Sequence, residues 1–349
     1  MDILKFYFKK FWVLFLFIIP SLVFFFLCVI RTNRAIILKG DTTLFTSVIN
    51  IHTENEQKGS FSTIYVYNVE KATLFQNFIA EHSDTSESYL MSDASTHISG
   101  MENYHAGKIQ YNSSIGNALV LAYSEASKED PSIKLDYKFI GYQITYYGLN
   151  SSFRIGDLIK GVYSKTYGST IMVDDDVNLY KEVLTNYERV DEDYFIINRN
   201  GTMMNIPYIK NVNTFSAYGI YECNPIKSNP TYDVSSNLIG GPSGGLLQTL
   251  SIYNQLVKED LTHGLRIAGT GTISPDGKVG MIGGIKEKIP TAFDDKMDVF
   301  FCSKGNIEEA REAYAKLPNR NMKLIEIETF YDALNYLKEG YKNDFGSEE

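Results

Sequence analysis

The sequence is poor in the residues that build disulfide frameworks and metal centres. Its 349 residues include only three cysteines, Cys28, Cys223 and Cys302, which are too few for a disulfide framework. The five histidines are scattered, and none stands in a metal-ligand spacing such as HExxH, which disfavours a zinc peptidase. We therefore expect no metal and no other cofactor.

Two further features narrow the class of partner. The net charge of −9 at pH 7 argues against nucleic acid. No GxxxxGK(S/T) pattern occurs, so we expect a protein that works without ATP.

Hydrophobic residues make up 44% of the chain, which is ample for a packed core, and the length suggests two or three domains.

One long uncharged run stands near the amino terminus. Residues 11–30 carry no charge and are numerous enough to span a bilayer. A cleaved signal peptide is the alternative, but the run is too long for one and no small-x-small site follows it. Basic residues flank both ends of the run, Arg31 and Arg34 among them, but the three lysines before it together with the amino terminus favour a short tail, residues 1–10, inside the cell. We predict a single-pass transmembrane anchor in the cell membrane, with the rest of the chain extracellular.

Mixed α/β structure is predicted for residues 35–127. Strand-like alternation or apolar runs occur at Ala35–Lys39, Thr43–Ile51 and Phe61–Tyr67, and a helical pattern covers Lys108–Ser127. The charged segment 128–135 contains a proline and is typical of a linker.

A separate module is predicted for residues 133–211. Gly156-Asp157 before a hydrophobic pair, a helix over 176–187 and a hairpin through Asn198–Gly201 resemble bacterial PDZ domains. That resemblance implies peptide docking by strand addition, with 141–149 as the docking loop and strand. The alternative is a mixed α/β module that serves only as a spacer.

The most informative stretch is the run Gly-Gly-Pro-Ser-Gly-Gly at 240–245. The glycines and proline before Ser243 force a sharp turn, and apolar residues after it repeat at helical spacing. Ser243 is therefore expected at a helix N-terminus, where free backbone N–H groups would stabilise an oxyanion. A helix cap or a phosphate site are the alternatives for such a turn.

A serine hydroxyl is a poor nucleophile without a base, and lysine serves as one only if burial keeps its amine neutral. A helix over 285–294 places Lys286 on the side of Ile289, Pro290 and Phe293, and Lys288 on a wetter side. We therefore predict that Lys286 meets Ser243. The alternative is that Lys286 is one charge of a solvated helix start.

Together these motifs resemble a known family. The serine turn, the Gly-Thr-Gly-Thr run at 269–272, the Asp-Gly-Lys turn at 276–278 and Gly-Gly-Ile-Lys-Glu-Lys at 283–288 look like the proteolytic domain of Lon, in its order and nearly its spacing. The resemblance implies a serine–lysine dyad peptidase with Ser243 as nucleophile and Lys286 as general base. It implies Thr270 as a supporting hydroxyl, and Gly241 and Gly244 as supports of the turn.

Two positions depart from the family pattern. Lon has aspartate where this chain has Gly240, and alanine where it has Gly244.

The predicted protein is thus an α/β (α+β) chain with a Lon-like catalytic domain at 215–349. Residues 35–127 belong to that domain, the PDZ-like module is inserted between the two parts, and a transmembrane helix precedes them. Anchor, module and peptidase together resemble membrane-anchored, PDZ-containing Lon-like proteases of Gram-positive bacteria. This implies an ATP-independent serine endopeptidase acting on extracytoplasmic peptides or flexible protein segments. A non-catalytic PDZ scaffold and a serine–lysine amidase for a small substrate are the alternatives, and the oligomeric state is open, homo-oligomers included.

Overall fold

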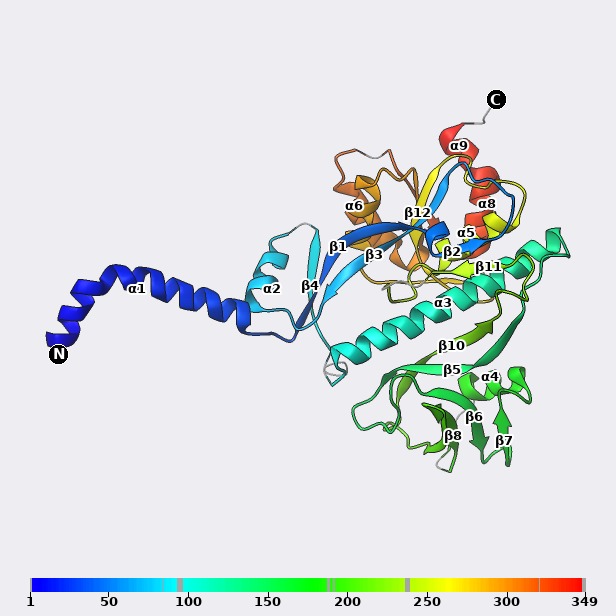
Figure 1. Ribbon diagram of the computed structural model, residues 1–349, viewed down its shortest axis with the longest axis horizontal. Coiled ribbons are helices and arrows are strands. Elements are labelled where there is room, and N and C mark those ends of the chain that lie inside the picture. The colour runs from blue at the N-terminus through cyan, green and yellow to red at the C-terminus, as the bar shows by residue number, and fades with distance from the viewer. Residues whose placement is uncertain are drawn as a thin grey trace.

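The computed structural model describes residues 2–83, 85–92, 97–186, 189–190, 192–235, 239–319 and 321–346, and gives the backbone alone for residues 2–4, 8, 15 and 186. Within this part of the chain, two sheets lie on opposite sides of one long helix, α3 (Gly100–Glu129) (Figure 1). The chain is a mixed α/β protein, as the sequence predicts.

The first sheet has six strands in the order β16-β15-β12-β3-β1-β4. The first four run parallel, while β1 and β4 are antiparallel to their neighbours. Because β3 pairs with β12, strands from both ends of the chain form one sheet. In chain order the strands are β1 (Arg34–Leu44), β3 (Ser60–Val69), β4 (Ser86–Leu90), β12 (Arg266–Thr270), β15 (Val299–Ser303) and β16 (Lys323–Ile327).

Helices cover both faces of this sheet. Strand β15 is buried along its whole length; Phe301 packs in the cluster that contains α5, and Phe300 packs in the cluster that contains α6 and α7. This alternation follows from the two-residue period of a strand, and a strand buried on both faces reads as a continuous apolar run. The covering helices are α5 (Gly245–Leu256), α6 (Ile285–Asp294), α7 (Ile307–Ala315) and α8 (Phe330–Asn335).

The second sheet is antiparallel and has the order β10-β5-β6-β8-β9, with β7 paired to β6. Its core includes Phe153, Tyr180 and Phe195, all fully buried. The elements are β5 (Tyr137–Tyr147), β6 (Leu158–Ser164), β7 (Ser169–Met172), α4 (Val177–Asn186), β8 (Tyr194–Arg199), β9 (Thr202–Pro207) and β10 (Phe215–Cys223). Tyr187, the last residue of the predicted helix, lies outside the described residues.

Strand β10 bears on the predicted module in two ways. It pairs with β5 from Phe215 opposite Tyr147 to Cys223 opposite Tyr137, so the second sheet continues beyond residue 211. It also occupies the edge of β5, the strand within which the peptide-docking segment is predicted. Strand addition by a foreign peptide at that edge would require β10 to leave.

The two connections to the second sheet emerge side by side. The N–H of Asn224 donates to the carbonyl of Asp136 at 2.8 Å, and Asn229 and Lys134 form a β-bridge. A module can be inserted into a domain where both of its ends emerge close together at the surface.

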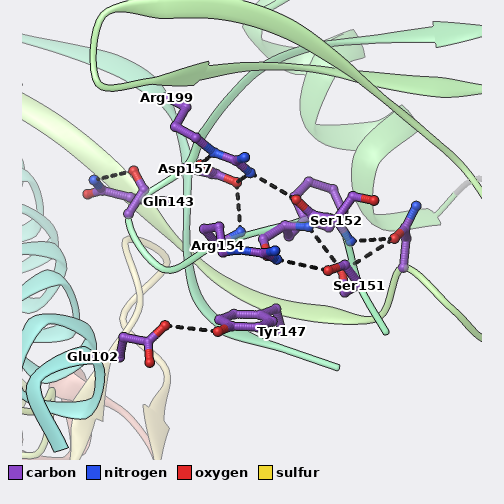
Figure 2. Close-up of polar contacts among 11 residues, drawn as sticks. Glu102, Gln143, Tyr147, Ser151, Ser152, Arg154, Asp157 and Arg199 are labelled. Carbon is purple, nitrogen blue, oxygen red and sulfur yellow. Dashed lines mark hydrogen bonds and ion pairs between the residues drawn. The ribbon is translucent and has the colours of Figure 1, made fainter. Parts of the chain in front are cut away.

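A polar network stiffens the turn after β5 and joins it to α3 (Figure 2). Asp157 is 1% exposed and accepts two hydrogen bonds from the Arg199 guanidinium, both at 2.6 Å, and one from the N–H of Arg154. Such bidentate, charge-assisted pairs are strong and directional. From the end of β5, the Tyr147 hydroxyl donates to Glu102 in the first turn of α3 at 2.8 Å.

The remaining elements are short or lie at the ends of the chain. Helix α2 packs on β4, and two small two-stranded sheets, β11-β2 and β13-β14, both contact helix α5. Apart from helix α1, the remaining elements are η1 (Phe45–Ser47), β2 (Ile49–Ile51), α2 (Leu74–Glu81), β11 (Tyr232–Val234), β13 (Thr272–Ile273), β14 (Val279–Gly280), η3 (Lys304–Asn306), the π-helical turn Tyr336–Gly340 and α9 (Tyr341–Phe345).

Helix α1 (Asp2–Val29) extends away from both sheets (Figure 1) and meets α2 through the edge-to-face rings of Phe24 and Phe75. In the described part of the chain, no helix combines the length and the apolar character that crossing a membrane requires. The transmembrane anchor over residues 11–30 stays a prediction.

The shared sheet predicts how fragments behave. Residues 224–349 alone lack β1, β3 and β4, so β12 would be an open edge over an uncovered apolar face, and we expect this fragment to be unfolded. Residues 34–349 with 137–223 replaced by a short Gly/Ser linker should fold, with a lower Tm because α3 loses its contacts with β5 and β10. Circular dichroism and thermal unfolding test both, and a cooperatively folded 224–349 fragment would rule the insertion out.

Candidate active site

The turn that carries Ser243 is held against helix α3. Gly241 adopts a left-handed φ of +86°, which favours glycine, and its N–H donates to the carbonyl of Gly107 at 2.8 Å. A Cβ added at Gly240 would lie 3.3–3.5 Å from backbone atoms of Gly107. The turn and the helix therefore meet backbone to backbone at Gly240 and Gly107. Gly241 supports the turn, but its N–H is occupied and cannot serve an oxyanion.

The backbone of Ser243 is fixed to the end of β12. Its carbonyl accepts from the N–H of Gly271 at 2.8 Å and from the hydroxyl of Thr270 at 3.1 Å. Helix α5 begins two residues later and is buried throughout. Within the described residues, the N–H groups of Ser243 and Gly244 have no hydrogen-bond acceptor. These two donors, at a helix N-terminus, are free to bind a negatively charged oxygen.

Lys288 is the lysine that reaches the serine. Its ammonium group donates to Ser243 Oγ at 2.9 Å and to Thr270 Oγ1 at 3.0 Å. Lys288 is 1% exposed, and among the described residues no carboxylate lies within ion-pair distance of it. Burial lowers the pKa of its side chain to about 7, so the neutral amine is well populated near neutral pH.

The prediction that Lys286 meets Ser243 is wrong. The Lys286 side chain is 44% exposed, and Nζ lies 3.5 Å from a Glu87 oxygen and 3.7 Å from a Glu309 oxygen. Partial burial lowers the pKa of this lysine, but the two carboxylates outweigh it, so the pKa lies above its ordinary value. Lys286 is thus a charged surface residue, which is the alternative that the sequence left open.

The rotation of α6 about its axis explains why the prediction of Lys286 was wrong. The buried side is formed by Ile285, Lys288, Ile289 and Ala292, whose i, i+3, i+4, i+7 spacing is that of an amphipathic helix packed on a sheet. The prediction relied on Pro290 and Phe293, which are only partly buried. Starting the count at Ile285, where the helix begins after Gly284, would have singled out Lys288.

Thr270 lies where the resemblance implies. It is fully buried, donates to the carbonyl of Ser243 and accepts from Lys288. Its hydroxyl therefore links the serine backbone to the lysine side chain. Ser243, Thr270 and Lys288 form one hydrogen-bonded cluster.

A cleft of about 680 Å³ opens beside Ser243 and Lys288. Residues 63–67 of β3 form one wall and residues 239–244 of the serine turn form another. Strand β12 pairs with β3 only up to Thr63, so in the described structure the backbone of β3 beyond that residue is unpaired on this side. A Cβ added at Gly244 would lie 2.9 Å from the Thr63 hydroxyl, so the room that alanine would need is taken.

A second titrating group lies next to the lysine in the sequence. Glu287 is 1% exposed, and its Oε2 has no hydrogen-bond partner in the described structure. Burial raises the pKa of this carboxyl to about 7, with a further contribution from Glu87. Glu287 does not line the cleft. A search of the described residues for three His, Cys, Asp or Glu side chains that could hold a metal found none.

Residues 238–339 match the Lon protease (S16) C-terminal proteolytic domain. This segment contains Ser243, Thr270 and Lys288. Lon protease from Campylobacter jejuni subsp. jejuni serotype O:2 (strain ATCC 700819 / NCTC 11168) is 30% identical over 125 residues, which are 36% of this chain and 14% of that protein. The chain therefore spans only a small part of that relative.

The comparisons support a Lon-type serine peptidase domain. The family match does not reach residues 133–211, so their assignment as a PDZ-like module stays a prediction.

The buried lysine predicts how stability varies with pH. A free lysine has a pKa of about 10.4, and that of Lys288 is lowered to about 7. Between these values the unfolded chain holds a proton that the folded chain has lost, so stability rises with pH. Below about pH 7 the lysine is charged in both states, and burying its charge costs the most.

We therefore expect Lys288→Met to have a higher Tm than the wild type near pH 6, with a difference that shrinks toward pH 10. Thermal unfolding of both proteins across this range measures it. Lys286→Met, which removes an exposed and paired charge, should show no such gain. A Tm difference that stays constant with pH would contradict the assignment.

Proposed function

We propose that the protein is a serine endopeptidase in which Ser243 is the nucleophile and Lys288 the general base. The observation that carries the proposal is the 2.9 Å contact between Lys288 Nζ and Ser243 Oγ, at a site where no described carboxylate neutralises the lysine. A lysine of lowered pKa can take the serine proton near neutral pH, which activates the hydroxyl for attack on a peptide carbonyl.

The reaction divides into two steps. In the first, Ser243 Oγ bonds to the carbonyl carbon as its proton moves to Lys288, and the lysine then protonates the departing amine. In the second, Lys288 takes a proton from water as the water oxygen bonds to the acyl carbon. The ester bond to Ser243 Oγ then breaks, and Lys288 returns the proton to Oγ, which restores the serine and the neutral amine. Thr270 accepts one N–H of the lysine at 3.0 Å and so aims the amine at Ser243.

The free N–H groups of Ser243 and Gly244 are the proposed oxyanion site. Both precede the N-terminus of α5, where the helix dipole also favours negative charge. Removing one such donor in other enzymes costs roughly 10²–10³-fold in rate. The clamp on the Ser243 carbonyl by Gly271 and Thr270 holds these donors in place before substrate arrives.

The open edge of β3 supports an extended substrate. A peptide laid along residues beyond Thr63 could pair with their free backbone groups and bring its carbonyl to Ser243. Such pairing requires an unfolded or flexible segment. Because no ATP-binding loop of the GxxxxGK(S/T) type occurs in the sequence, we propose flexible or already unfolded substrates.

The extracytoplasmic setting at a membrane surface is proposed from the uncharged run at 11–30 alone. Fractionation of cells, followed by protease accessibility of the C-terminal part, tests it; a freely soluble intracellular protein would refute it.

We expect Ser243→Ala and Lys288→Met each to lower peptide hydrolysis by roughly 10³-fold or more, and the double variant to be little worse, because the two groups act as one unit. Hydrolysis of unstructured peptides, followed by mass spectrometry, is the measurement, with circular dichroism to verify folding. Lys286→Met is the matched control and should retain activity. Near-wild-type turnover by Ser243→Ala or Lys288→Met would refute the dyad.

Activity should rise with pH. The base must be neutral in the free enzyme, so we expect kcat/KM to increase through about pH 7 as Lys288 loses its proton. Glu287 has a pKa raised to about 7 as well, so Glu287→Gln serves as the control and should keep the rise. A profile that is flat, or that falls without first rising, would be incompatible with Lys288 as the base.

A further inference from the structure

A β-bulge in β1 lies opposite the wall of the substrate cleft. Lys39 pairs with Val66 and Thr42 pairs with Ile64, so Gly40 and Asp41 together stand opposite Tyr65. A Cβ added at Gly40 would lie 2.1 Å from the carbonyl oxygen of Tyr65, so only glycine fits there. Bulges next to active sites commonly redirect a side chain, and this one turns Asp41 toward the tyrosines of β3.

Two of those tyrosines hold the Asp41 carboxylate. The hydroxyls of Tyr65 and Tyr67 both donate to Asp41 Oδ2, at 2.9 and 3.2 Å, and the two rings meet edge to face. Tyr65 and Tyr67 also line the cleft that contains Ser243 and Lys288. The carboxylate is thus fixed at the border of the proposed substrate site.

The charge of Asp41 is uncompensated in the described structure. The neighbouring cation, Lys39, pairs with Asp294, and Thr42 donates to Asp295, so both point to α6 and the residue that follows it. Asp41 is exposed, and its Oδ1 accepts no hydrogen bond from the described residues. An anchored carboxylate with one free oxygen is suited to a lysine or arginine side chain.

We propose that Asp41 is a specificity-determining residue that selects substrates with a basic side chain near the cleaved bond. Thr63 lies beside Gly244 at the nucleophile, and Tyr65 and Tyr67 follow on the same face of β3, at about 7 and 13 Å along the strand. The basic residue of an extended substrate therefore lies two to four positions from the bond that is cut. This proposal rests on the proposed peptidase function.

The test compares three proteins on a pool of unstructured synthetic peptides, and then on matched pairs in which lysine at the selected position is replaced by glutamine. Asp41→Asn removes the charge but keeps an oxygen that can accept from both tyrosines. Asp175→Asn, an exposed aspartate in the turn before α4, removes the same charge far from the cleft. We expect the lysine-to-glutamine ratio of kcat/KM to fall roughly fivefold in Asp41→Asn and to be unchanged in Asp175→Asn.

The Asp41→Lys variant reverses the charge at position 41 and separates charge recognition from a merely structural effect. We expect this variant to prefer peptides with glutamate over peptides with lysine at the selected substrate position. If the wild type cleaves peptides but its ratio is the same in Asp41→Asn, the inference is overturned while the peptidase function stands.

A second arm does not depend on turnover. Fluorescence anisotropy measures binding of the same peptide pairs to Ser243→Ala, with and without Asp41→Asn. If the wild type cleaves no peptide, the proposed function fails. Charge-dependent binding that Asp41→Asn abolishes would then still support the recognition site, and equal binding of both peptides would overturn it.

Discussion

The site depends on one constraint, a lysine buried without a counter-charge. Lys288 is 1% exposed, and its described polar contacts are the hydroxyls of Ser243 and Thr270. Burying an unpaired ammonium is unfavourable, and the group responds by losing its proton more readily. The same burial that weakens the fold near neutral pH is what makes the amine a base there. A carboxylate beside Lys288 would stabilise the protein and remove the reactivity.

That burial requires parts of the chain that are distant in sequence. Lys288 lies on the buried side of α6, which packs on β1 and β3 from the first part of the chain, whereas Thr270 ends β12 in the last part. The serine turn is held by Gly107 in α3, whose first turn is tied to the second sheet through Glu102 and Tyr147. The second sheet is thus connected to the catalytic turn through α3, and none of its described residues lines the cleft.

The sequence predicts those features that depend on local rules. The sharp turn at Ser243 and the helix after it follow from glycine, proline and apolar spacing, whereas Thr270 was implied only by the resemblance to the Lon proteolytic domain. The identity of the lysine does not, because it depends on the rotation of α6 by a fraction of a turn, which packing against β1 and β3 decides. The pairing of β10 with β5 could not be predicted either, because no local sequence pattern identifies strand partners that are distant in the chain. The sequence predicts one strand over 43–51, but β1 ends at Leu44, a 3₁₀ turn follows at Phe45–Ser47, and β2 begins at Ile49.

The glycines explain why this chain departs from the Lon pattern at two places. The Cβ of an aspartate at 240 would lie 3.3–3.5 Å from backbone atoms of Gly107, and the Cβ of an alanine at 244 would lie 2.9 Å from the Thr63 hydroxyl. A neighbour therefore occupies the place of a side chain at Gly244, and a neighbour stands close to that place at Gly240. Glycine has more backbone conformational freedom than other residues, and the contacts with Gly107 and Thr63 restrict that freedom in the folded chain. Close packing around Gly240 and Gly244 thus helps to fix the turn that carries the N–H groups of Ser243 and Gly244.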